Sequence, residues 1–202
     1  MSDNGEFYRD YWMQAVKMWQ MKKNPSDCVQ ALVDVVTPLV SPQFRDWLEV
    51  ERRLGTRLPS DYKRVVDLYG PGEFLGLRLF VPDAPGDEFN LDTLVAKVQR
   101  RAQQYRDEVR PRVSAPYFPQ DGGLIPWGEN GEGDYFFWCP FGDDPDWWPV
   151  MIADVSWGAY YLPHRSVSGY LSEYLTPPIG RVSGMGADLP DLPGVPKFIP
   201  AS

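Results

Sequence analysis

The chain has 202 residues, of which 43% are hydrophobic and 14% aromatic, and its formal net charge is −8. This length suits one domain with appended segments, and the composition excludes global disorder. The two cysteines, Cys28 and Cys139, exclude a disulfide framework and lack the partners of a structural zinc site. Because free thiols are typical of a reducing compartment, we expect a cytoplasmic protein.

The first forty residues predict a helical extension. Aromatic and aliphatic residues recur at helical spacing over residues 6–23, and a second short helix is expected around Leu32. Charged residues interrupt the place of a signal-peptide core, and the apolar run broken by Asp34 and Pro38 is too short to span a bilayer, so no membrane segment is expected. The extension either packs as an extra helical layer or offers an aromatic face to a partner.

Two short helices joined by a tight corner are expected within residues 41–70. Ser41 should cap the first helix, with Pro42 at its first position and Gly55 as its left-handed stop. The second should begin near Pro59 and end at the glycine that starts a Gly-Pro-Gly run. The residues expected to be buried are Phe44, Trp47, Leu48 and Leu54 in the first helix and Tyr62, Val65, Val66 and Tyr69 in the second.

A strand and a long helix are expected next. Residues 74–82 are rich in Leu, Phe and Val and end in proline, which is typical of a strand. The helix should run from Leu91 to Val109 with Asn90 as its cap. Its basic residues share the segment with acidic ones, which favours a solvated face over a phosphate-binding one.

Residues 121–175 predict an antiparallel meander followed by a last helix. Four strand-like runs, separated by Gly, Asn, Asp and Pro turns, lie at 124–128, 134–140, 148–154 and 157–163. Residues 176–202 contain six prolines and should form an irregular tail. The sequence therefore predicts an α+β fold: a mainly antiparallel sheet covered by helices over 41–175, with an N-terminal helical extension over 1–40 and a C-terminal tail over 176–202.

Two blocks of the chain resemble the signatures of the SUKH superfamily, the Smi/Knr-type domain. The first spans residues 47–72, and the second is LIPWGENGEGDYFFWC at 124–139. Neither block is a catalytic motif, so the resemblance implies binding rather than chemistry. Members of the family are mostly bacterial immunity proteins that neutralise polymorphic toxins, often nucleases, and fungal relatives act as interaction hubs. The matched residues of the first block, which we expect to hold the fold, are Trp47, Glu51, Leu54, Gly55, Leu58, Pro59, Asp61, Tyr62, Tyr69, Gly70 and Gly72.

The negative charge is concentrated in the predicted meander. Residues 121–175 contain nine acidic residues and one basic residue, a difference that equals the net charge of the whole chain. Five of the eight tryptophans lie there too, and adjacent Trp147 and Trp148 cannot both face the core from one strand. Acidic loops beside an exposed indole would suit a basic protein, whereas they would repel nucleic acid. The alternative is a solvated acidic surface that keeps the protein soluble.

The leading hypothesis, with the resemblance added, is an immunity protein that occludes a cognate toxin or other basic protein. The alternative is an intracellular adaptor for a non-toxin partner, which the appended helices and the Pro-rich tail would recruit. The predicted partner-binding residues are Trp127, Glu129, Glu132, Asp134, Asp143, Asp144, Asp146, Trp147 and Trp148.

No motif of catalysis or metal binding accompanies these residues. The glycines of residues 128–133 stand beside acidic residues that oppose a phosphate, which favours a strand-to-strand turn. The acidic run at 143–146 lacks the spacing of an EF-hand loop, and nothing supports glycosidase chemistry by Glu129 and Glu132. His164, the sole histidine, has no triad or zinc context. We therefore predict a non-enzymatic protein without cofactor or metal.

Overall fold

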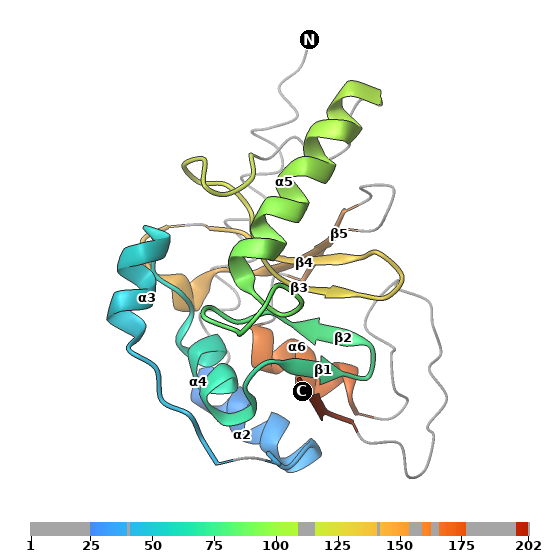
Figure 1. Cartoon of the computed structure of the whole chain (residues 1–202). Coiled ribbons are helices and arrows are strands. Elements are labelled where there is room, and N and C mark those ends of the chain that lie inside the picture. The colour runs from blue at the N-terminus through green and yellow to red at the C-terminus, as the bar shows by residue number, and fades with distance from the viewer. Residues whose placement is uncertain are drawn as a thin grey trace.

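The computed structural model of the chain describes residues 25–39, 41–108, 116–140, 142–153, 159–162, 166–176 and 197–201. These residues form an α+β fold in which helices cover a seven-stranded sheet (Figure 1). The strand order is β6-β5-β4-β3-β2-β1-β7, and every neighbouring pair is antiparallel. The predicted fold class is confirmed. The helix predicted over residues 6–23 lies outside the described residues.

The four runs predicted as a meander are consecutive strands of this sheet. They are β3 (Ile125–Asn130), β4 (Tyr135–Trp138), β5 (Val150–Ala153) and β6 (Ala159–Leu162). The single strand predicted over residues 74–82 is instead a hairpin of β1 (Gly72–Phe74) and β2 (Leu77–Leu79). Leu75 and Gly76 turn the chain there with φ of 44° and 86°, both in the left-handed region.

Side chains alternate between the two faces of the sheet along each strand, and both faces are buried. Phe136, Trp138 and Ile152 belong to one core cluster, and Phe137 and Met151 belong to the other. The second cluster includes the buried stripe of α5 (Leu91–Glu108), whose first turn is capped by the Asn90 side chain as predicted. In Figure 1, α5 lies on one side of the sheet, and α2, α4 and α6 lie together on the other.

The helices of the opposite face are α2 (Pro25–Val35), α4 (Ser60–Tyr69) and α6 (Val167–Tyr174). Helix α2 packs against α6 and α4, and its Leu32 is fully buried. This part of the predicted N-terminal extension therefore forms a helical layer. Helix α6 follows the meander as predicted, and the Ser166 hydroxyl caps it by accepting a hydrogen bond from the Gly169 amide.

Helix α3 (Trp47–Leu54) is shorter than predicted and leaves much of its predicted core exposed. Asp46, rather than Ser41, caps its first turn by accepting from the Glu49 amide, while Gly55 ends it with φ of 72° as predicted. Phe44 is therefore outside the helix. Its side chain is 82% exposed and that of Leu48 is 81% exposed, so the prediction that both are buried is wrong.

The extended segment before α3 follows α4 instead of continuing the helix. The Gln43 amide donates to the Asp67 carbonyl at 2.8 Å, and the Arg45 guanidinium donates to the Val66 carbonyl at 3.3 Å. These bonds satisfy polar groups of the segment at the carboxyl end of α4. The segment makes these bonds to α4 in place of the first helical turn that Ser41 and Pro42 were predicted to start.

The prediction of an irregular tail is wrong for residues 197–201. Ile199 and Pro200 form β7, which pairs with β1 at the edge of the sheet. Phe198 is buried against Tyr69 and Phe74 in the same core as α4. The core thus includes residues of α2 and of the C-terminal segment, both predicted as appendages. The rest of the predicted tail after residue 176 lies outside the described part of the chain.

Candidate protein-binding surface

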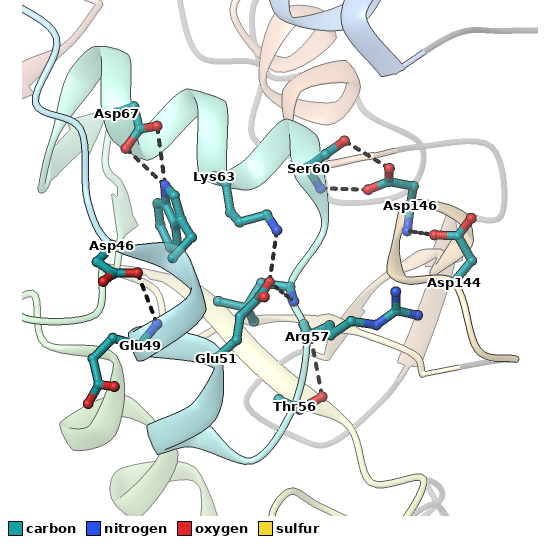
Figure 2. A network of polar contacts seen from close by, with 12 residues as sticks. Asp46, Glu49, Glu51, Thr56, Arg57, Ser60, Lys63, Asp67, Asp144 and Asp146 are labelled. Atoms are coloured by element: carbon teal, nitrogen blue, oxygen red, sulfur yellow. Dashed lines mark hydrogen bonds and ion pairs between the residues drawn. The ribbon is translucent and has the colours of Figure 1, made fainter.

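A network of polar contacts joins α3 to α4 and defines the α3–α4 corner, residues 43–67 (Figure 2). The Glu51 carboxylate accepts from the Leu58 amide at 2.9 Å and from the Lys63 ammonium at 2.8 Å. The Trp47 indole N–H lies 3.1 and 3.2 Å from the two carboxylate oxygens of Asp67. Each bond crosses from α3 to α4 or to the turn that starts it, so polar groups fix α3 together with its buried Val50.

The acidic loop, residues 142–148, packs against the start of α4. Asp146 accepts from both the amide and the hydroxyl of Ser60, so a carboxylate of the loop caps this helix end (Figure 2). Arg57 donates to the Asp143 carbonyl. Within the loop, the Asp144 carboxylate caps the short 3-10 helix η1 (Pro145–Trp147). The exposed side chains of Asp143 and Asp144 are therefore presented by a loop held at several points.

The tryptophans proposed as anchors are largely inside the protein. Trp127 has no exposed surface, and its ring packs against Phe136 and Tyr170. Trp148 is 7% exposed and its indole donates to the Gly142 carbonyl. Trp147 is half-buried. Trp127 and Trp148 therefore cannot offer an indole to a partner in this conformation, because their strand and loop positions place them against the core.

Two of the predicted partner-binding carboxylates are also buried. Glu129 forms ion pairs with Arg78 of the neighbouring strand and with Lys97 of α5. The Asp134 carboxylate accepts from the Asn130 amide side chain at 2.6 Å within the β3–β4 turn. Such internal partners compensate the burial of charged groups. Neither residue presents a free carboxylate, which corrects the prediction that both face a partner.

The remaining acidic residues fall at opposite ends of β4. Glu132 is exposed in the turn before this strand, whereas Asp143 and Asp144 are exposed in the loop after it. A strand of four residues separates the two ends by about 13 Å. In Figure 1 the β3–β4 turn points away from α3, while the acidic loop lies near α4, as its contacts require. The structure therefore divides the single acidic surface predicted from composition into two.

The exposed apolar pair Phe44 and Leu48 is the feature that the sequence pattern did not predict. A signal for it was present, since Asp46 followed three residues later by Glu49 is the pattern of a capping box. Starting the helix at Trp47 places Phe44 in an extended segment and removes the reason to assign it to a buried stripe. In the same helix as Leu48, Arg52 and Glu49 form an exposed ion pair.

The titratable groups at the helix contacts support structural roles. Asp61 is buried and accepts from the Ser168 amide at 2.8 Å and hydroxyl at 2.9 Å, which ties α4 to α6. Burial raises the pKa of the Asp61 carboxyl above its ordinary value. Burial also raises the pKa of the Cys139 thiol, which disfavours the nucleophilic thiolate.

The described residues contain neither a metal site nor a membrane span. No group of three or more His, Cys, Asp or Glu side chains among them could hold a metal ion. Likewise, none of the described helices combines the length and the apolar character needed to cross a bilayer.

A family model agrees with the resemblance found in the sequence. The SUKH_6 model, described as SMI1-KNR4 cell-wall, matches residues 45–160, which is more than half of the chain. The chain belongs to the SUKH superfamily. No curated protein and no solved structure matches it significantly. The family is consistent with a binding domain of the immunity or regulatory type.

The SUKH signature residues have structural tasks in this chain. Glu51 and Trp47 fix α3 to α4, and Gly55 supplies the left-handed end of α3. Asp61 joins α4 to α6, and the Tyr62 hydroxyl donates to the Phe80 carbonyl at 2.7 Å. The signature therefore accounts for the fold of the corner, and a binding function must depend on other residues of the surface.

Proposed function

We propose that this SUKH protein is a cytoplasmic immunity protein that neutralises a cognate toxin by covering it, without covalent chemistry. The observation that carries the proposal is the acidic loop, because the bonds from Ser60 of α4 to Asp146 hold the loop that carries the exposed Asp143 and Asp144. A loop already ordered before binding loses less conformational entropy when a partner docks. Family membership supports a protein partner over a small substrate.

A basic toxin is the partner that fits this loop. Opposite potentials accelerate encounter and disfavour partners of the wrong charge. The exposed rings and methyl groups of Phe44 and Leu48 supply the apolar area that an acidic loop lacks. Because both parts belong to or rest on the α3–α4 corner, we propose that a toxin contacts the corner and not the β3–β4 turn.

The test is protection of cells against a toxin encoded beside this gene, with affinity measured on the purified pair. Replacing Asp143 and Asp144 with Lys should weaken binding at least tenfold and abolish protection. The matched control reverses the exposed Glu132 and Asp121, which gives the same change in net charge away from the loop. The control should slow association slightly and retain protection. Equal losses in both double variants would contradict the assignment of the loop as the site.

The description of the matched family model as SMI1-KNR4 cell-wall favours a second candidate, a regulatory adaptor for a non-toxin protein. Gene neighbourhood separates the two, since an adjacent toxin gene supports immunity and its absence supports the adaptor. In both cases the protein acts by binding. A purified chain that turned over a substrate, and lost that activity on His164→Ala or Glu129→Gln, would overturn the non-enzymatic proposal.

A further inference from the structure

The C-terminal segment, residues 197–201, contacts the rest of the protein as a short peptide ligand would. Its strand β7 pairs with β1 through Pro200 opposite Gly72 and Ile199 opposite Glu73. The Ala201 amide extends the pairing by donating to the Pro71 carbonyl at 3.0 Å. The segment thus adds a final strand to the edge of a sheet, which is a common mode of peptide recognition.

One side chain of the segment fills an aromatic socket. The Phe198 ring centroid lies 4.5 Å from that of Phe74 and 5.3 Å from that of Tyr69, and Phe198 is almost completely buried. A Cβ atom at Gly72 would lie 2.5 Å from the Phe198 ring and 2.6 Å from the Ile199 carbonyl oxygen. Only glycine fits at position 72 while the C-terminal segment is bound, since any side chain there would collide with Phe198 and Ile199.

Outside this socket, the C-terminal segment makes few contacts with the rest of the protein. Lys197 donates to the Leu175 carbonyl at 3.0 Å, where α6 ends. Only two residues pair in β7, and Ile199 remains 54% exposed at the edge of the sheet. In sequence, 22 residues, 175–196, separate this segment from the end of α6. A segment that pairs through two residues on an edge strand and leaves Ile199 exposed has few contacts to break, so it can open without global unfolding.

We propose that the outer edge of β1 and its aromatic socket form a strand-addition site for an extended peptide, occupied in cis by residues 197–201. The ligand class is a segment with an aromatic residue followed by an apolar residue and proline, as in the chain's own Phe198-Ile199-Pro200. Backbone bonds to β1 would give affinity, and the socket between Tyr69 and Phe74 would select the ring. This site is separate from the acidic loop and does not depend on the immunity proposal.

Cis occupancy would regulate access to this site. A linker of moderate length keeps the attached segment at an effective concentration in the millimolar range, so a free peptide must compete with it. A partner peptide therefore binds weakly to the closed chain and strongly once the segment is released. Residues 197–201 therefore act as an attached competitor of any free peptide that binds this site.

The first experiment uses a fluorescent peptide with the sequence of residues 196–202 as the probe. The full chain with Phe198→Ala should bind it at least about tenfold more tightly than the unchanged chain, measured by anisotropy, and its melting temperature should rise with peptide. A peptide with Ala in place of Phe should bind neither chain. Val98→Ala, which removes a buried side chain of α5 in the other core cluster, is the matched control and should gain no binding. Equal gains in both variants would overturn the proposal.

A second experiment does not depend on the Phe198 variant folding. A protease recognition sequence inserted after Gly186 allows the linker of the otherwise unchanged full chain to be cut after purification. The released segment should remain bound at high concentration, dissociate on dilution and exchange with the fluorescent probe. Adding Gly72→Ala to this chain should abolish capture of the probe. A segment that never exchanges, or a cut chain that never binds the probe, would show that β7 is only a structural strand.

Discussion

Helices α3 and α4 have similar amphipathic sequences, yet they are buried to different extents. Tyr62, Val65 and Val66 of α4 are fully buried under the sheet. In α3 only Val50 is buried, and polar contacts of Trp47 and Glu51 add to this packing in attaching the helix to α4. The comparison shows that apolar residues at helical spacing do not by themselves determine burial. Leu48 of α3 and Phe44 just before it are exposed although both were assigned to the buried stripe.

The deeper burial of α4 should have its largest effect on the free energy of unfolding when a central side chain of this helix is removed. Tyr62→Ala should lower the free energy of unfolding by about 3–5 kcal/mol, because it deletes a buried ring that packs 4.7 Å from Trp138 and a hydrogen bond to Phe80. Chemical denaturation measures this change. Tyr62→Phe, which removes only the hydroxyl, should lose about 1–3 kcal/mol. A loss below about 1 kcal/mol for Tyr62→Ala would contradict the assignment of α4 to the core.

The buried Asp61 should give the next largest effect. Asp61→Ala leaves the Ser168 amide and hydroxyl without their acceptor and should lower the free energy of unfolding by about 1–3 kcal/mol. Asp61→Asn retains an acceptor oxygen and should lose less. Denaturation of the three proteins at one pH tests this order. An alanine variant as stable as the asparagine variant would show that the bonds to Ser168 contribute little.

The same carboxyl predicts a pH dependence of stability. Burial raises the folded-state pKa of Asp61 above its unfolded value of about 3.9, so the folded protein holds this proton more tightly. Its stabilising contribution is therefore complete below about pH 3.9 and is lost as the pH rises through the raised pKa. Denaturation from about pH 3 to about pH 8 should show the unchanged chain losing stability relative to Asp61→Asn. A constant difference between the two would contradict the shift.

The junction between the two helices should show a smaller effect. Gly55 has φ of 72° and open space where a Cβ atom would lie, so Gly55→Ala incurs backbone strain without a steric clash. We expect a loss of about 1 kcal/mol in the free energy of unfolding. Gly55→Asn should lose less, because asparagine tolerates the left-handed region better. Equal losses for the two variants would indicate that φ is not the cause.

The smallest effect on stability is expected at the exposed residues of the corner. Phe44→Ala and Leu48→Ala should each change the free energy of unfolding by less than about 0.5 kcal/mol. Under the proposed function, the same changes should weaken toxin binding by about 1–2 kcal/mol each. Denaturation and calorimetric titration of the same samples separate the two effects. A large loss of stability would place these side chains in contacts that the structure does not show.

The candidate site was harder to predict than the elements that carry it. The cap of α5 and the left-handed end of α3 depend on neighbouring residues, and both were found from the sequence. Local pattern could not show that Trp127 faces a helical layer or that Glu129 meets Lys97 of α5. Those facts depend on which distant elements lie against each strand.

The sequence by itself determined the fold class, the positions of the long helix and the meander, and membership of the SUKH family, because these follow from local periodicity, capping and turn residues. Only the tertiary structure decided that the acidic residues of the meander separate to opposite ends of β4 and that the C-terminal residues return to pair with β1. The physical reason is that exposure and pairing depend on contacts between residues far apart in the chain. Charge counted along the sequence contains no such information.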